Sequence, residues 1–180
     1  MRPLDTSATA ASRQHGAGPA LPGAGTCLVV DAGRTGCRAV LYAGDGDAGD
    51  GVVAGPGLPG VADGEGSAEP FVAVLAPLLR QLSLTSRPPS SRSSPGRPLD
   101  AVCVGMTGVL RPGPAAAAVA DAVHALLPVR RVLVTSDVVT GYCGAVGLGP
   151  GVVAAAGTGV IAIALGERGV ARVDGWGYIL

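Results

Sequence analysis

The sequence predicts an α/β fold in which helices flank a mixed β-sheet. Short runs of apolar and β-branched residues recur along the chain, and such runs are typical of strands. Glycine-rich turns separate the first runs, whereas patterns with helical spacing separate the later ones. The expected order is three strands, then helix, strand, helix, strand and helix, and finally a new pair of strands.

The first three strands are expected to form a β-meander. The opening strand is short and apolar, and it ends in the carboxylate of Asp31. A glycine-containing turn leads back into a second, alternating strand, and a turn rich in glycine and aspartate leads into a third. The first two predicted strands are residues 27–31 and 37–43, and the turn at 32–36 joins them. The third predicted strand begins with residues 52–55, after the turn at 44–51.

An amphipathic helix follows the meander and is expected to pack on the sheet. Ser67 is a suitable N-cap, and Glu69 and Pro70 suit the first turn. Pro77 lies inside the apolar pattern and predicts that the helix is kinked or divided there. The apolar residues at helical spacing are Phe71, Val74, Leu75, Leu78, Leu79 and Leu82.

The rest of the chain alternates between strands and helices. Residues 84–98 are rich in Ser, Pro and Arg and are expected to form a flexible surface insert. Ser136 and Asp137 can cap the last helix. The remaining elements are a strand at 101–106, a helix at 114–127 stopped by Pro128, a strand at 132–135, a helix at 138–146, and two strands within 152–165.

The amino-acid composition limits the classes of protein to which the chain can belong. The 180 residues are 48% hydrophobic with a mean hydropathy of +0.45, which is enough for one globular core. The formal net charge is zero, which argues against nucleic acid or an anionic membrane as partner. No segment reaches the about 20 apolar residues that span a bilayer. Residues 1–25 lack the apolar core of a secretory signal and are expected to be a disordered tail.

Cysteine spacing favours free thiols. The four cysteines form no C-x-x-C pair, and three of them sit in apolar runs. We therefore expect buried thiols in a reducing cytosol, rather than disulfides or metal ligands, and a cytoplasmic protein. The cysteines are Cys27, Cys37, Cys103 and Cys143.

Two glycine turns are candidate anion sites. Gly157, Thr158 and Gly159 join the last two predicted strands, and Gly33 lies in the turn after the first strand. Glycine lets clustered backbone N–H groups approach phosphate oxygens closely. Each turn, taken alone, is also explained by an ordinary hairpin.

Four motifs in order resemble those of the BadF/BadG/BcrA/BcrD-type ATPases and the related N-acetylglucosamine kinases, within the sugar kinase, actin and Hsp70 superfamily. That family carries a D-G-G-G-T loop, a T-D-A helix start, a G-T-G-S turn and a G-G-W-G segment. The counterparts here are Asp31–Thr35, Ser136–Val138, Gly157–Val160 and Asp174–Leu180. The resemblance implies a ribonuclease-H-like, actin-like ATPase lobe over residues 26–148 and the first strands of a truncated second lobe over 149–180.

The resemblance also implies ATP and Mg²⁺ as cofactors and a sugar as substrate. Phosphoryl transfer needs the phosphates and Mg²⁺ held in line and the attacking hydroxyl deprotonated. By resemblance, Asp31 would orient Mg²⁺ through water, and Asp137 would accept the sugar proton, although a helix cap explains Asp137 better when it is taken alone. The phosphate-binding residues would be Gly33, Thr35, Gly157, Thr158 and Gly159, and the sugar-binding residues Asp137, Gly175, Trp176 and Gly177.

The chain also departs from the family pattern. Arg34 stands where the loop has a glycine, and it either pairs with phosphate or blocks it. Val160 replaces the serine after G-T-G, and Leu58 takes the place of an asparagine that reaches the sugar. The sequence stops before G-D-E-G-S and before the half that completes the nucleotide site, so the chain alone is expected to have little or no kinase activity.

Three functions therefore stay open. The first is the N-terminal part of an ATP-dependent sugar or amino-sugar kinase. The second is a degenerate lobe that binds ATP or regulates without catalysis. The third is an activator ATPase of a dehydratase, which would need cysteines to hold a shared iron–sulfur cluster, and none here has convincing spacing. A homodimer is left open.

Overall fold

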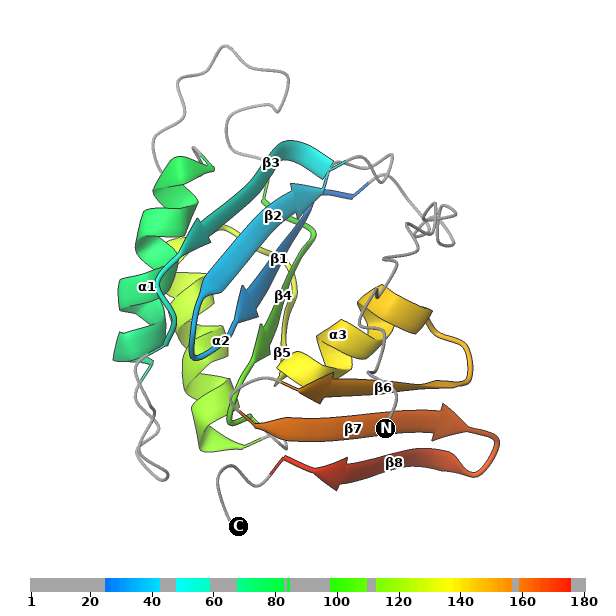
Figure 1. Cartoon of the computed structure of the whole chain (residues 1–180). Coiled ribbons are helices and arrows are strands. Elements are labelled where there is room, and N and C mark those ends of the chain that lie inside the picture. The colour runs from blue at the N-terminus through cyan, green and yellow to red at the C-terminus, as the bar shows by residue number, and fades with distance from the viewer. Residues whose placement is uncertain are drawn as a thin grey trace, which may run out of the picture.

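The computed structural model describes residues 25–42, 48–58, 68–82, 84, 98–109, 113–156 and 159–175. The order of elements agrees with the sequence-based prediction through β7 (Figure 1), but the predicted final pair of strands is wrong, because a third strand, β8, follows it. The predicted tail at 1–24 and most of the predicted insert at 84–98 lie outside the described residues. The elements are β1 (Cys27–Ala32), β2 (Cys37–Tyr42), β3 (Ala48–Gly55), α1 (Glu69–Gln81), β4 (Ala101–Met106), α2 (Pro114–Leu126), β5 (Val132–Ser136), α3 (Asp137–Val146), β6 (Gly151–Ala156), β7 (Val160–Gly166) and β8 (Gly169–Asp174).

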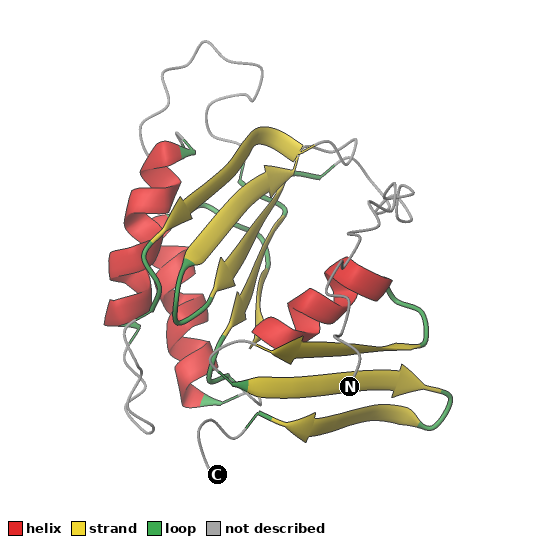
Figure 2. Cartoon of the chain, in the orientation of Figure 1, coloured by secondary structure: helices red, strands yellow, loops and turns green. Residues whose placement is uncertain are grey.

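Two sheets form the framework. The larger has the order β3-β2-β1-β4-β5, in which β1, β2 and β3 pair antiparallel and β4 and β5 extend β1 in parallel. The smaller is an antiparallel meander of β6, β7 and β8. Figure 2 shows α1 and α2 on one side of the larger sheet and α3 on its other side, next to the smaller sheet. The predicted α/β fold with a mixed sheet is confirmed.

The main core lies between the larger sheet and the helices α1 and α2. Along β1 and β4, every second residue is buried on this side, because alternate side chains of a strand point to opposite faces. Each fully buried Val or Leu contributes about 1.5–3 kcal/mol to stability. The largest completely buried side chains are Leu28, Val30, Leu75, Leu78, Leu79, Leu82, Val102, Val104 and Val123.

Helix α1 differs from the prediction in two details. It begins after Ala68, which serves as N-cap without a side-chain hydrogen bond, so the predicted cap at Ser67 is wrong. The helix also continues through Pro77 without being divided. Proline removes the hydrogen bond to the carbonyl of Ala73, but Ala73 lies on the exposed side of the helix, where water can satisfy that carbonyl.

Helix α3 connects the two sheets. It contacts β1, β4 and β5 of the larger sheet and β6 and β7 of the smaller one. Val138 and Tyr142 of α3 form a second buried cluster with Ile163 of β7. The hydroxyl of Tyr142 donates a 2.6 Å hydrogen bond to the carbonyl of Gly149, which holds the loop between α3 and β6. Among the described helices, none is long and apolar enough to cross a membrane.

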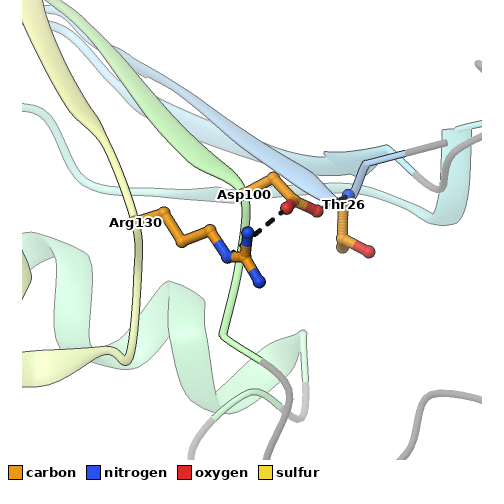
Figure 3. Close-up of polar contacts among 3 residues, drawn as sticks. All are labelled: Thr26, Asp100 and Arg130. Atoms are coloured by element: carbon orange, nitrogen blue, oxygen red, sulfur yellow. Dashed lines mark hydrogen bonds and ion pairs between the residues drawn. The ribbon is translucent and has the colours of Figure 1, made fainter. Parts of the chain in front are cut away.

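A polar cluster holds the amino-terminal ends of the parallel strands together (Figure 3). Asp100, just before β4, accepts a 2.9 Å hydrogen bond from the backbone N–H of Thr26, just before β1. Arg130, before β5, lies 3.8 Å from the other carboxylate oxygen of Asp100. This cluster is at the opposite end of the strands from Asp31 and links the segments that precede β1, β4 and β5.

The cysteines follow the prediction only in part. All four are free thiols, and Cys37 is buried. Cys27 and Cys103 are half-buried, whereas Cys143 is exposed on α3, so a buried position for Cys143 is wrong. Among the described residues, no group of three His, Cys, Asp or Glu side chains is placed to hold a metal ion.

Candidate functional site

A polar row crosses the larger sheet near the carboxyl ends of β1, β4 and β5. Asp31 is paired with Arg38 of β2 on one side and with Gly105 of β4 on the other. Gly105 is paired in turn with Thr135 of β5. Residues paired across neighbouring strands point to the same face, and this face is opposite to the one on which Val30 is buried. The row therefore lies on the side of α3.

Gly105 allows α3 to approach the sheet. A Cβ atom at this position would overlap the side chain of Thr140, so the helix lies directly on the strand backbone. The hydroxyl of Thr140 donates a 2.9 Å hydrogen bond to the carbonyl of Asp137 in the first turn of α3. The absence of a side chain at Gly105 thus brings the start of α3 over the polar row, beside Asp31.

Asp137 is the first residue of α3, and its predicted role as a cap is only partly correct. Ser136 is the N-cap, and its side chain makes no capping hydrogen bond. Instead, Asp137 Oδ1 accepts hydrogen bonds from the backbone N–H of Val138, at 2.8 Å, and from the hydroxyl of Ser136, at 3.2 Å. Both interactions use one carboxylate oxygen, so Oδ2 keeps its capacity to accept a further hydrogen bond or a proton.

The two candidate acids interact. Partial desolvation raises the pKa of Asp31 above its usual value, the negative charge of Asp137 raises it further, and the positive charge of Arg38 opposes this effect. Asp31 and Asp137 are 106 positions apart in the sequence, yet the fold brings them close enough for the charge of Asp137 to raise the pKa of Asp31. Two neighbouring carboxylates attract a divalent cation.

The turn after β1 is held from two sides. The backbone N–H of Gly33 donates to the carbonyl of Gly36 at 3.1 Å, which closes the hairpin. On one side, the N–H of Leu58 donates to the carbonyl of Gly33 at 2.9 Å, and on the other, the N–H of Thr107 donates to the carbonyl of Ala32 at 3.1 Å. A loop held in this way presents its remaining groups, including those of Thr35, in one conformation.

Leu58, which the sequence analysis aligned with a sugar-contacting asparagine, is buried. Its side chain is only 3% exposed and belongs to the main core. Gly57, immediately before it, lies so close to the backbone of Arg34 and Gly36 that a Cβ atom would overlap them. The segment of residues 56–58 therefore secures the glycine turn, and Arg34 remains exposed.

The smaller sheet returns the chain to the start of α3. Gly151 contacts Val146 at the end of α3, and β6 then runs back along the helix. Figure 1 shows the end of β6 beside the beginning of α3. The six residues of β6 extend about 20 Å and the ten residues of α3 about 15 Å, so Ala156 at the end of β6 lies near the start of the helix.

The outcome for the remaining predicted residues is mixed. Gly159 lies exposed at the start of β7. Gly175 has a positive φ of 88°, and its N–H donates to the carbonyl of Val160 at 3.0 Å, so it lies at the same end of β7. The predicted residues Gly157, Thr158, Trp176 and Gly177 lie outside the described residues.

Sequence reasoning missed the residues that build the row around Asp31. Arg38 could have been found from the hairpin alone, because a turn centred on residues 33–36 pairs positions 31 and 38. Gly105 and Thr140 carried no such signal, since their contact depends on the position of a helix that begins some 30 residues after β4.

A magnesium site fits the geometry. Mg²⁺ is usually held by one or two carboxylates together with substrate phosphates and water, rather than by a full set of protein ligands. Asp31 beside the glycine turn meets this requirement, with the charge of Asp137 close by. The residues present could therefore support a magnesium–nucleotide complex, with Asp31 as the carboxylate beside the metal.

Comparison with known proteins supports the architecture. No protein family and no curated protein matches the chain by sequence. A candidate N-acetylglucosamine kinase from Chromobacterium violaceum is similar in structure, with a TM-score of 0.59, 27% sequence identity, and coverage of 86% of this chain and 50% of that one. A candidate N-acetylglucosamine kinase from Porphyromonas gingivalis is similar with a TM-score of 0.62, 20% identity and the same coverage.

The fold is that of an actin-like ATPase lobe. This lobe spans about half the length of each of the two matched structures. In the actin-like ATPase lobe described here, the β1–β2 turn, the carboxyl ends of β1 and β4, and the start of α3 lie around one edge of the larger sheet.

Proposed function

We propose that the chain is the N-terminal lobe of an ATP-dependent sugar or amino-sugar kinase of the N-acetylglucosamine kinase type. Such an enzyme transfers the γ-phosphate of ATP to a sugar hydroxyl. The observation that carries the proposal is the packing of α3 on Gly105, which brings the start of the helix, with Asp137, beside Asp31 and the glycine turn. Similarity to two candidate N-acetylglucosamine kinases supports the same assignment.

In the proposed site, the β1–β2 turn binds the nucleotide phosphates. The donors are backbone N–H groups of the turn other than that of Gly33, which is bonded to Gly36, together with the hydroxyl of Thr35. They are positioned because the turn is held by Leu58 and Thr107. Asp31 orients the hydrated Mg²⁺ that accompanies the nucleotide. Bound Mg²⁺ neutralises charge on the phosphates and keeps them in line for transfer.

The second carboxylate acts on the acceptor. Asp137 has one oxygen occupied by Ser136 and Val138 and the other available, which suits a general base that is fixed in orientation. In this proposal, Asp137 Oδ2 accepts the proton of the sugar hydroxyl as that hydroxyl attacks the γ-phosphate.

The proposal extends to the division of the chain. Residues 26–148 form the lobe with the first phosphate turn, and residues 149–180 begin a second lobe that carries the Gly157–Gly159 clamp. One lobe offers at most half of the nucleotide contacts, so the chain alone is proposed to bind nucleotide weakly and to transfer phosphate little or not at all.

The first test is calorimetric titration of the 180-residue chain with Mg-ATP. Saturable binding is expected, and Asp31→Asn should weaken it by about tenfold or more and reduce its dependence on Mg²⁺. Asp121→Asn, an exposed change on α2, is the matched control and should leave the affinity unchanged. Absence of saturable binding by the wild-type chain would contradict the proposal.

The second test addresses the general base. In a protein that carries both lobes, Asp137→Asn is expected to lower ATP-dependent phosphorylation of glucosamine or N-acetylglucosamine by at least about 100-fold, with Mg-ATP binding retained. Undiminished phosphorylation would show that Asp137 is only structural.

A non-catalytic ATP-binding module is the second candidate. It is favoured by the buried position of Leu58, which leaves no side chain at that point to contact a sugar. The two candidates differ in their ligands, because such a module would bind Mg-ATP and show no response to any sugar.

A further inference from the structure

Three of the four cysteines gather where α3 packs on the larger sheet. Cys103 of β4 is paired with Val29 of β1, so it points to the same face as Cys27, two residues earlier on that strand. Gly105, on which α3 lies, is two residues after Cys103 and belongs to the same face. Cys143 is an exposed residue of α3. The fold thus brings thiols from β1, β4 and α3 to one contact between a helix and a sheet.

Cys143 lies opposite Cys103 across this contact. Helix α3 runs back along the larger sheet from the carboxyl ends of β4 and β5 (Figure 1), so it is roughly antiparallel to β4. Thr140 lies directly on Gly105. Three residues further along α3 is Cys143, about 4.5 Å along the helix axis, and two residues back along β4 is Cys103, about 6.6 Å along the strand. The two thiols are therefore offset by only about 2 Å along this direction.

The helix lies close enough to the strand for a covalent link. A Cβ atom at Gly105 would lie 2.9 Å from the Cβ atom of Thr140, so no side chain of β4 separates the two backbones at this point. A disulfide joins Cα atoms that are about 4.4–6.8 Å apart. Burial raises the pKa of the Cys103 thiol, and the neighbouring thiols of Cys27 and Cys143 raise it further, which agrees with the proximity of the three groups.

Cys143, rather than Cys27, is the suitable partner for Cys103. Cys27 and Cys103 are diagonal neighbours on adjacent strands, and such residues have Cβ atoms about 7 Å apart, whereas a disulfide needs about 3.8 Å. The hydrogen bonds of the sheet hold both strands in place. Cys143 is on a helix and is exposed, so a dissolved oxidant can reach it. Cys37 is buried.

We infer that Cys103 and Cys143 are a redox-active pair, which a small-molecule disulfide such as oxidised glutathione converts into a disulfide that links β4 to α3. The thiolate of Cys143 attacks one sulfur of the small disulfide and forms a mixed disulfide, and the first small thiolate leaves. The thiol of Cys103 then loses its proton to solvent, and its sulfur attacks the sulfur of Cys143, so that the second small thiolate leaves. The two cysteines lose two electrons and two protons, and the small disulfide gains them as two thiols.

This link forms whether or not the chain binds a nucleotide. It holds α3 on the sheet at the same contact that brings Asp137 beside Asp31. It also closes a loop between positions that are 40 residues apart, which restricts the unfolded chain. The oxidised chain should therefore resist unfolding better than the reduced chain.

The test is incubation of the folded, reduced 180-residue chain with a large excess of oxidised glutathione, followed by alkylation of the remaining thiols and peptide mass spectrometry. Trypsin cleaves after Arg130 and Arg131, so Cys103 and Cys143 fall in different peptides and a disulfide between them joins the two. We expect this joined peptide from wild type. We also expect a rise in the urea midpoint of about 1 M or more, which reduction reverses.

Serine variants identify the partners. Cys143→Ser, an exposed change, should keep the unfolding midpoint of the reduced chain and lose both the joined peptide and the shift on oxidation. Cys103→Ser should lose the same two signals. Cys27→Ser is the matched control, because it removes the third thiol of the group, and it should keep the joined peptide and the shift.

Three results would overturn the inference. One is a wild-type chain that keeps all of its thiols under these conditions. Another is a disulfide between Cys27 and Cys103 in place of the expected one. The third is a dimer linked through Cys143, visible on a non-reducing gel, in place of a cross-linked monomer.

Discussion

Asp31 illustrates how a single side chain takes its properties from distant parts of the chain. Its neighbours in the sheet, Arg38 and Gly105, come from β2 and β4, and Asp137 comes from α3. A carboxylate at the end of a short strand is ordinarily solvated and has an ordinary pKa. Here partial burial and the charge of Asp137 raise the pKa of Asp31, and Arg38 opposes the rise. The raised pKa can be tested directly.

We expect Asp31 to make the folded protein less stable as the pH rises. Its pKa is higher in the folded state than in the unfolded chain, so the folded state binds more protons and stability falls with increasing pH through this range. Asp31→Asn should therefore be more stable than wild type at neutral pH, and the difference should disappear below the ordinary carboxyl pKa of 3.8.

Urea unfolding at a series of pH values measures this effect. The causes can be separated by following the Asp31 carboxyl by NMR, because Asp137→Asn should lower its pKa and Arg38→Gln should raise it. Titration curves for Asp31 that are identical in these variants and in wild type would show that the three groups do not interact.

At the scale of elements, the decisive feature is the close approach of α3 to β4. Helices usually pack on a sheet through side chains of both elements, whereas here Gly105 contributes none and Thr140 fills the space. The same helix packs its other side on β6 and β7, so its position also sets that of the smaller sheet.

Gly105→Ala is expected to destabilise the chain by about 1–3 kcal/mol, because the new methyl group overlaps Thr140 and forces α3 away from the sheet. Thr140→Ala in the same chain should recover part of this loss, because it removes the two closest overlapping atoms, Oγ1 and Cγ2, and leaves only the Cβ. Gly141→Ala, on the exposed side of α3, has open space and is the control, expected to be neutral or stabilising. Chemical denaturation of wild type and the three variants measures these differences, and a Gly105→Ala chain as stable as wild type would contradict the packing described.

At the scale of the whole molecule, one face of the smaller sheet is apolar and open to solvent. Residues that are paired across β6, β7 and β8 point to the same face of the sheet. On the face that points away from α3, the side chains are those of Val and Ala. Val152 is 70% exposed and Val173 is 69% exposed. Contiguous apolar surface of this kind is uncommon on a monomer. The residues of this face are Val152, Ala154, Ala156, Val160, Ala162, Ala164, Ala171 and Val173.

This face should make the isolated chain bind hydrophobic dyes in the native state. Val152→Thr combined with Val173→Thr is expected to reduce the fluorescence of bound anilinonaphthalene sulfonate severalfold, with little change in the unfolding midpoint, because both side chains are exposed. Leu133→Thr, which is 60% exposed on the larger sheet, is the control and should have a smaller effect. Dye binding that does not respond to the double variant would mean that other surfaces bind the dye.

The sequence by itself determined the order of the elements as far as β7 and several of their bounds, but it missed β8 and placed the start of β3 four residues late. The strand at 101–106 agrees with the prediction at both ends, and α2 ends one residue before the predicted limit. These features follow from periodicity, turn residues and proline, which act over a few neighbouring positions. The sequence also indicated Asp31 and Asp137 as candidate site residues. The order of the motifs along the chain is enough for this, and the distance between the two side chains need not be known.

Only the tertiary structure decided what surrounds those residues. The register between β1, β2 and β4 placed Arg38 and Gly105 beside Asp31, and the missing side chain of Gly105 admitted α3. The burial of Leu58 and the uninterrupted course of α1 through Pro77 were likewise decided by packing. Such outcomes depend on contacts between residues far apart in the chain, and local sequence patterns carry no information about which distant surface a side chain will meet.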